Sequence, residues 1–352
     1  MADSTVGQPA DHLAPGRDYP RDLTQFRAWF ATDEACADYL DWLRFADGFQ
    51  CQHCGSQRLS GRAGRRRCTD CDGHISVTAG TVLERTRTPL TVWFEAAWLM
   101  VADKSGVSAT HLHRVLPIAS YQTAWTLLAK LRSVMGAADA EPLSGRVEVD
   151  ETFFGGPRPG VRGRGALGKT LVAGAIELSE HGWGRARLAI IEDASAATLQ
   201  AFAEANIAVG STVVTDAWSA YPSALVDYRH EPFNVSASGQ PAHESLSAIH
   251  RLFALVKREI EGTYQGAGSV EHLQEYLDEF IFRFSRRHSR WRGLVFMRLL
   301  QRAVTSDPVT YQHLIRTPRS KNVPPPGVTG PRSQPGSLQP TPAGRPWRSG
   351  PQ

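Results

Sequence analysis

The sequence is short of three things: cysteine, long apolar runs and, at its C-terminal end, negative charge. Its 352 residues include five cysteines, and four of these fall in two C-x2-C pairs, so a disulfide framework is not expected. No apolar run reaches the length of a membrane span. The first twenty residues lack a basic stretch followed by an apolar core, so we expect no secretory signal and a cytoplasmic protein.

The length predicts two or three domains, and a hydrophobic content of 41% is enough for ordinary cores. The formal net charge is +4, but its distribution is uneven. Residues 316–352 contain six basic side chains and no acidic one, and they are rich in Pro, Gly and Ser. This composition predicts a disordered basic tail, which is either a solvated extension or a loose attraction for phosphate.

The four clustered cysteines predict a metal site. Cys51, Cys54, Cys68 and Cys71 form C-x2-C-x13-C-x2-C, in which two knuckles supply four thiolates suited to tetrahedral zinc. A redox pair is the alternative, but two matched pairs argue against it. A closed shell of four thiolates is structural, so we predict a zinc ribbon over 49–86. It follows an N-terminal lead with a short helical segment over 1–48.

The loop between the two cysteine pairs is basic. It contains five arginines and no acid, and Arg65, Arg66 and Arg67 are consecutive. A positive loop on a rigid zinc platform is a plausible nucleic-acid contact, although a merely solvated loop would have the same composition.

Three short helices are predicted over 89–137. Apolar residues recur at helical spacing, Gly106 and Pro117 interrupt the pattern, and Ser108 and Ser120 are typical N-caps. Three such helices joined by tight turns resemble a helix-turn-helix that binds DNA, but many small helical bundles have the same pattern.

Two aspartates end predicted strands in the second half of the chain. Asp150 ends the alternating strand of "VEVD", and Asp216 ends the β-branched run of "STVVTD". The predicted order over 145–305 begins with three strands, a helix and a strand, which resembles an α/β ribonuclease-H-like nuclease domain with a mixed sheet and flanking helices. In that fold the first and fourth strands are neighbours. Two facing carboxylates would repel unless Mg²⁺ or Mn²⁺ joined them, although either aspartate alone could be a turn or cap residue.

A third ligand is expected from a later helix. His250 and Lys257 are two helical turns apart in an amphipathic segment and therefore share a face. The helical register favours His250 as the third ligand, and Glu244 is the alternative.

The stretch "GRGALGKT" at 163–170 matches the spacing of a nucleotide-binding P-loop. A P-loop needs a buried strand before it and a helix after it, whereas "GGPRPGVR" precedes this stretch and the strand-like "TLVAGAIEL" follows. We therefore expect no nucleotide cofactor. The stretch instead belongs to a Gly-rich hairpin in which Arg162, Arg164 and Lys169 are available for DNA phosphate, unless the hairpin is only a mobile surface loop.

Taken together, these motifs resemble the bacterial insertion-sequence transposases of the ISXO-like group. The motifs that carry the resemblance span about 25–305 and are "CQHCGS", "CTDC", "SVTAGTVLERTRTPLTVWFEAAWLM", "VEVDETFFGG", "GRGALGKT", "GSTVVTDAWSAY", "HRLFALVKREIEGTYQG" and "HLQEYLDEFIFRFSRR". The group combines a zinc ribbon with a DDE-type nuclease domain.

The resemblance implies roles for individual residues. Asp150 and Asp216 match the first two acids, and Lys257 matches a lysine that contacts DNA phosphate near the cut. The wider superfamily has Glu as the third ligand and related groups have Asn, whereas this chain has His250, which prefers softer ions and favours Mn²⁺ or a lower activity.

The resemblance also implies metal-dependent cleavage at insertion-sequence ends and strand transfer into target DNA. The implied partners are terminal inverted repeats and target DNA, bound by a homo-oligomer associated with the nucleoid. Two other interpretations remain. One is a catalytically impaired or domesticated DNA-binding protein, and the other is a metal-dependent nuclease or resolvase on the same fold.

Overall fold

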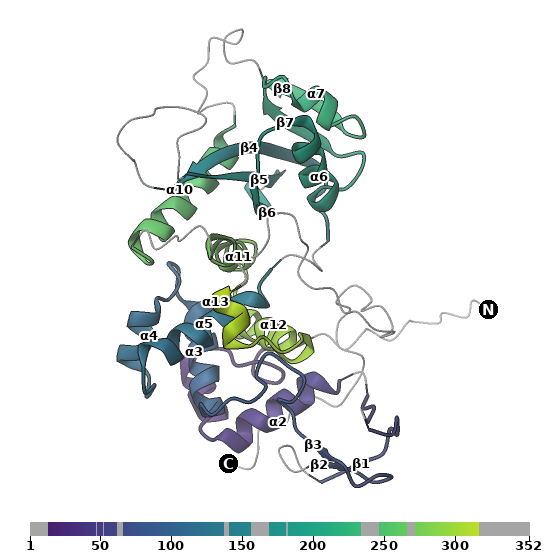
Figure 1. Ribbon diagram of the computed structural model, residues 1–352, viewed down its shortest axis with the longest axis vertical. Coiled ribbons are helices and arrows are strands. Elements are labelled where there is room, and N and C mark those ends of the chain that lie inside the picture. The colour runs from purple at the N-terminus through teal and green to yellow at the C-terminus, as the bar shows by residue number, and fades with distance from the viewer. Residues whose placement is uncertain are drawn as a thin grey trace, which may run out of the picture.

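The structure is a computed structural model that describes residues 13–46, 48–51, 53–61, 66–136, 141–155, 169–180, 182–233, 246–265 and 272–316. Figure 1 shows three tiers: a five-stranded sheet with its helices at the top, a helical module in the middle, and a small three-stranded sheet at the bottom. Among the helices that the structure describes, none has both the length and the apolar character needed to cross a bilayer.

The small sheet has the antiparallel order β1-β2-β3 and carries one cysteine of the quartet, Cys68, in its central strand. Its strands are β1 (Leu59–Ser60), β2 (Arg66–Cys68) and β3 (His74–Ile75). Such short strands bury little apolar surface, so this sheet depends on the cysteine centre for its stability.

The helical module contains the predicted helices and shares one apolar core with helices from both ends of the described chain. Its helices are α1 (Leu23–Trp29), α2 (Asp33–Arg44), α3 (Leu90–Ala102), α4 (Ala109–Val115), α5 (Tyr121–Ser133), α12 (Arg292–Thr305) and α13 (Tyr311–Arg316). Ser108 and Ser120 cap α4 and α5 as predicted, each accepting a backbone N–H from the first turn.

The five-stranded sheet has the order β6-β5-β4-β7-β8, in which β4 and β7 are parallel neighbours. Its elements are β4 (Arg146–Phe154), β5 (Thr170–Ser179), β6 (Gly182–Ile191), α6 (Ala196–Asn206), β7 (Thr212–Asp216), α7 (Tyr221–Ala224), β8 (Arg229–Phe233), α10 (Ser247–Gly262) and α11 (Leu273–Phe284). The order of strands and helices predicted from the sequence is confirmed, and β8 is an additional strand.

Helices cover both faces of the sheet (Figure 1), and each face has its own core. Val147 and Val149 of β4 point into the core formed with α6 and α7. Because side chains alternate along a strand, Glu148 and Asp150 face the other side, where α10 and α11 pack. Thr170 opens β5 rather than a helix, so the P-loop interpretation of "GRGALGKT" is excluded.

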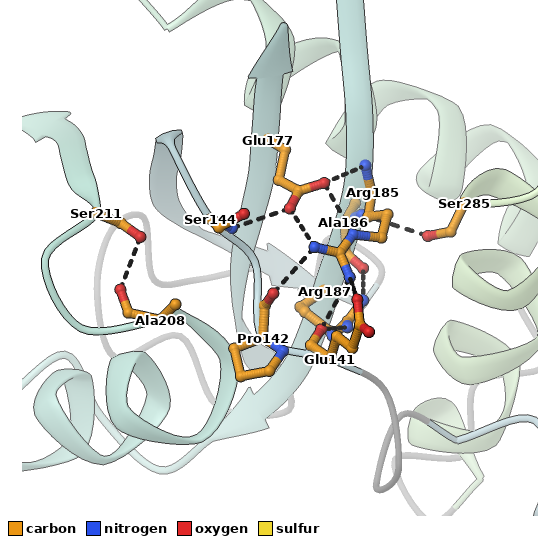
Figure 2. Close-up of polar contacts among 10 residues, drawn as sticks. All are labelled: Glu141, Pro142, Ser144, Glu177, Arg185, Ala186, Arg187, Ala208, Ser211 and Ser285. Atoms are coloured by element: carbon orange, nitrogen blue, oxygen red, sulfur yellow. Dashed lines mark hydrogen bonds and ion pairs between the residues drawn. The ribbon is translucent and has the colours of Figure 1, made fainter. Parts of the chain in front are cut away.

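The segment leading into β4 is held by a cross-strand ion pair, as Figure 2 shows. The Glu177 carboxylate of β5 accepts hydrogen bonds from the Arg185 guanidinium of β6 and from the Ser144 backbone N–H at 2.9 Å. Arg185 also donates to the backbone carbonyls of Glu141 and Pro142. These contacts fix where β4 begins and therefore which of its residues lies at each position along the sheet.

Two expected boundaries differ from the cores that the structure shows. Helix α12 lies within the expected nuclease segment 145–305, yet it packs with α2 and α3 in the core of the helical module. Likewise, α1 and α2 of the expected lead over 1–48 belong to the same core as 89–137. The residues beyond Arg316, for which a disordered tail is expected, lie outside the described residues.

Candidate active site and metal centre

The two aspartates lie on neighbouring parallel strands. Asp216 ends β7 as predicted, whereas Asp150 lies within β4, which continues to Phe154 instead of ending at Asp150. The pairing of β4 with β7 runs from Arg146 opposite Thr212 to Glu148 opposite Val214, and the same register carried two residues further aligns Asp150 with Asp216. Both side chains therefore belong to the face that α10 covers. They are half-buried, and each carboxylate accepts a backbone N–H: from Glu151 at 2.8 Å for Asp150, and from Trp218 at 3.0 Å for Asp216.

His250 joins this pair from α10. Its Nε2 lies 3.1 Å from Oδ2 of Asp150, and its ring is half-buried. The hydrogen bond to Asp150 raises the pKa of His250; burial opposes this effect, and the charges of Asp150, Glu148 and Asp216 reinforce it. The imidazole is thus within electrostatic reach of both aspartates, as the helical register predicts.

Glu148 is a part of this site that the sequence analysis did not identify. Its carboxylate is buried and accepts the backbone N–H groups of Ala248 at 3.0 Å and Ile249 at 2.9 Å, in the first turn of α10. Burial raises the pKa of Glu148, while these two hydrogen bonds, the next largest effects, lower it. A carboxylate at a helix N-terminus satisfies N–H groups that have no partner within the helix. Glu148 therefore fixes α10 immediately before His250.

Lys257 extends the contact between β4 and α10. Its Nζ donates to Oγ1 of Thr152 at 2.6 Å and lies 5.5 Å from the centre of the Phe154 ring. Burial lowers the pKa of Lys257, and the nearby charge of Lys169 acts in the same direction. Lys169 is exposed, directly before β5. Lys257 is therefore within electrostatic reach of Asp150, and Lys169 is within reach of Lys257.

The cysteine quartet is the tightest group of possible metal ligands. Within the described part of the chain, it alone brings three or more ligand atoms of His, Cys, Asp or Glu within 4.8 Å of one another. The Cys51 and Cys71 sulfurs are 3.7 Å apart, and those of Cys54 and Cys68 are 3.5 Å apart. Zinc at about 2.3 Å from each sulfur requires edges of about 3.8 Å, so the quartet fits a tetrahedral zinc ion.

The knuckle backbone favours a thiolate at Cys68 but not at every cysteine. Backbone N–H groups, from Asp70 first and also from Cys71, lower the pKa of Cys68 to about 6. A backbone hydrogen bond at Ser56 lowers the pKa of Cys54, but burial and hydrogen bonds with the other three cysteines raise it to about 12. A thiolate is the form that binds metal.

The predicted basic residues of the ribbon have partners within the chain. Arg66 forms an ion pair with Asp41 of α2 and so ties the ribbon to the helical module. Arg67 is exposed and pairs with Asp72 at 2.9 Å. Four other residues considered in the sequence analysis lie outside the described residues: Arg65, Arg162, Arg164 and Glu244.

The sheet order and the aligned aspartates define a class, a ribonuclease-H-like domain of the DDE type preceded by a zinc ribbon. The comparison with known families agrees. A model of the ISXO2-like transposase domain matches residues 142–285, and a model of the transposase zinc-ribbon domain matches residues 31–74. Together the two models cover just over half of the chain. The protein belongs to the ISXO2-like transposase family. No curated protein matches the sequence.

Proposed function

We propose that this protein is a DNA transposase that cleaves at the ends of its insertion sequence and joins the freed ends to target DNA. The observation that carries the proposal is the parallel register of β4 and β7, which aligns Asp150 with Asp216, while α10 brings His250 to the same face. Two carboxylates on one face, with an imidazole hydrogen-bonded to Asp150, would form an anionic site for phosphoryl transfer.

The donor atoms at this site are of the kinds that a divalent cation binds. Carboxylate oxygens are ligands that Mg²⁺ and Mn²⁺ prefer, and an imidazole as the third donor favours Mn²⁺. A divalent cation held by Asp150, Asp216 and His250 would stabilise charge on the phosphoryl oxygens and lower the pKa of an attacking water. His250 is held in place by its hydrogen bond to Asp150 and by the Glu148 anchor of α10.

The cations around the site would hold DNA. Lys257 of α10 donates to Thr152, two residues beyond Asp150 on β4, and from there its ammonium would contact a phosphate next to the cut. We propose that Lys169 and the basic hairpin residues Arg162 and Arg164 neutralise further phosphates. The zinc ribbon and the helices over 89–137 would bind the terminal inverted repeats. Two ends must be handled together, so we infer a homo-oligomer on DNA in the cytoplasm, at the nucleoid.

A second function is favoured by one observation. Outside the cysteine quartet, the described residues gather no third ligand atom at metal-binding distance, and His250 stands where the wider superfamily has an acid. A DNA-binding protein with impaired or lost catalysis is therefore the alternative.

The decisive experiment compares variants on duplexes that carry the element's own terminal repeat, in Mg²⁺ and in Mn²⁺. We expect Asp150→Asn and Asp216→Asn to abolish strand cleavage while end binding is retained, because each change removes a charged oxygen ligand. His250→Ala is expected to be inactive and Glu244→Ala active; the reverse pattern would assign the third ligand to Glu244.

Binding without cleavage by the wild-type protein in both metals would support the alternative, a DNA-binding protein without catalysis. Transfer of the cut end into a second duplex distinguishes transposition from plain nuclease activity.

A further inference from the structure

The helical module contains a cleft of about 250 Å³ beside α5. The segment 85–88 before α3 forms one wall, the face of α5 from Gln122 to Lys130 forms another, and Tyr311 of α13 also lines the cleft. The lining side chains are two cations, hydroxyl and amide groups, aromatic rings and one leucine, with no carboxylate among them. This chemistry is complementary to a negatively charged ligand.

The two cations differ in their setting. Lys130 is half-buried and donates from Nζ to the Val82 carbonyl at 3.0 Å, which leaves two of its three N–H donors for other acceptors. Burial lowers the pKa of Lys130, and the nearby Glu84 opposes this effect. Arg85 lies at the mouth of the cleft with its side chain 92% exposed, 3.4 Å from Glu84. Its φ of 56° is a left-handed conformation that is uncommon outside glycine and is found at ligand-binding sites more often than elsewhere.

Helix α5 presents an outward face to the same cleft. Leu128 and Leu131 are buried in the core of the module, whereas Gln122 is exposed and lines the cleft. Tyr121, at the start of the helix, is 54% exposed. Helix α5 is the third of three consecutive short helices, which is the position of the recognition helix in a helix-turn-helix.

We propose that this cleft holds a backbone phosphate of duplex DNA between Arg85 and Lys130, with Gln122 placed to contact a base edge in the major groove. The inference rests on the proposed function, because it names the DNA contact made by the helical module. Threonine hydroxyls and cations are common phosphate partners, and a glutamine amide pairs with the edge of adenine. The Trp93 indole N–H already donates to Oγ1 of Thr86 at 2.8 Å, so the wall residues are held in place before DNA binds.

The test measures binding apart from catalysis. Full-length, zinc-loaded protein carrying Asp150→Asn is titrated with the terminal-repeat duplex and with a scrambled duplex over a range of salt concentrations. We expect Arg85→Ala and Lys130→Met to weaken binding to both duplexes by a similar factor and to reduce the slope of log K against log salt by about one each. Gln122→Ala is expected to weaken binding to the repeat about tenfold and to leave the scrambled duplex unchanged. Arg229→Ala, which removes an exposed arginine from β8, is the charge-matched control.

Arg85 is exposed, so Arg85→Ala is not expected to affect folding. If Lys130→Met unfolds the protein, the result for Arg85→Ala decides the test. Wild-type affinity and salt slope in Arg85→Ala would overturn the inference. A second result would also overturn it: inorganic phosphate or a free mononucleotide binds the wild-type protein, Arg85→Ala abolishes that binding, and duplex binding is unchanged. The cleft would then be a site for small anions and not for DNA. If end DNA binds through the cleft but is never cleaved by the protein with Asp150 intact, the proposed function fails and this inference holds.

Discussion

Gly174 determines how closely α10 approaches the aspartates. It lies opposite Asp150 in the antiparallel ladder of β4 and β5. A Cβ atom at this position would lie 2.6 Å and 2.8 Å from ring atoms of Phe253, and 2.9 Å from Cδ1 of Ile249. These distances are too short for real contacts, so the absence of a side chain at Gly174 is what allows α10 to place His250 beside Asp150.

We predict that Gly174→Ala lowers the rate of end cleavage by at least about tenfold, because displacing α10 lengthens the His250–Asp150 contact. Overpacking is also expected to lower the free energy of unfolding by about 1–3 kcal/mol. Gly262→Ala is the matched control, since a Cβ there meets nothing within 4 Å. Cleavage assays and urea unfolding measure the two effects. The double variant Gly174→Ala/Phe253→Leu should regain cleavage activity, because the smaller side chain makes room for the new Cβ. If it does not, the loss of activity in Gly174→Ala is not caused by displacement of α10.

The predictions from sequence succeeded where a local pattern was sufficient. The β-branched run identified Asp216 as a strand end, and two-turn spacing placed His250 and Lys257 on one face. The end of the strand that carries Asp150 was predicted wrongly, because β4 continues to Phe154. The contribution of Gly174 has no local signal, because it depends on which helix later packs against the strand.

At the scale of the element, α10 begins without a side-chain cap of its own. Its N-cap residue is Leu246, and Glu148 from β4 accepts the first N–H groups instead. A buried carboxylate on a strand is costly without a partner, but the sequence does not show that the partner of Glu148 is the start of a helix one hundred residues later.

We predict that Glu148→Ala lowers the free energy of unfolding by about 2–4 kcal/mol, because two buried N–H donors lose their acceptor. Cleavage should fall with it, since the turn that carries His250 loosens, while the affinity for end DNA is retained. Glu148→Gln keeps an oxygen at the same place and should preserve most of the stability. Thermal unfolding, cleavage rates and binding are compared for the two variants. Equal stability of wild type and Glu148→Ala would show that the helix start is held in another way.

At the scale of the whole molecule, buried charges join the helical module to the sheet domain. Arg132 of α5 pairs with Glu279 of α11 at 2.6 Å, and Arg283 of α11 pairs with Glu259 of α10. Arg283 also donates to the Lys104 carbonyl at 2.8 Å, just after α3. The sequence predicted the modules in their order, but it could not show that long-range ion pairs and α12 join them, because such pairs leave no periodic pattern.

One of these charges predicts a pH dependence. Burial raises the pKa of Glu259 from the ordinary 4.5 to about 7, although Arg283 lowers it. Between pH 4.5 and 7 the folded protein therefore keeps a proton that the unfolded chain has lost. The stabilising contribution of Glu259 is complete below pH 4.5 and is lost as the pH rises through 7, a fall of up to about 3 kcal/mol.

Urea unfolding at several pH values between 4.5 and 8 measures this slope. Glu259→Gln should flatten it, because an amide does not titrate. Glu261→Gln, at an exposed position on the same helix, should leave it unchanged. Parallel curves for wild type and Glu259→Gln would assign the slope to another group.

The ion pair between Arg132 and Glu279 gives the clearest test of how the two parts of the molecule are coupled. Both side chains are at most 3% exposed, and the Arg132 guanidinium also lies 4.6 Å from the centre of the Tyr276 ring. Removing one partner leaves the other charge buried, so Arg132→Met and Glu279→Leu should each cost about 3–5 kcal/mol. The double variant keeps the balanced Arg283–Glu259 pair and should cost less than the sum of the single variants.

The unfolding transition itself gives a second readout, because the pair bridges two cores. The helical module contains Trp93 and Trp98, and the sheet domain contains Trp183 and Trp218. If the pair couples the cores, Arg132→Met should split one fluorescence transition in urea into two, and the double variant should bring them together again. Additive costs with a single transition throughout would mean that apolar packing alone joins the helical module to the sheet.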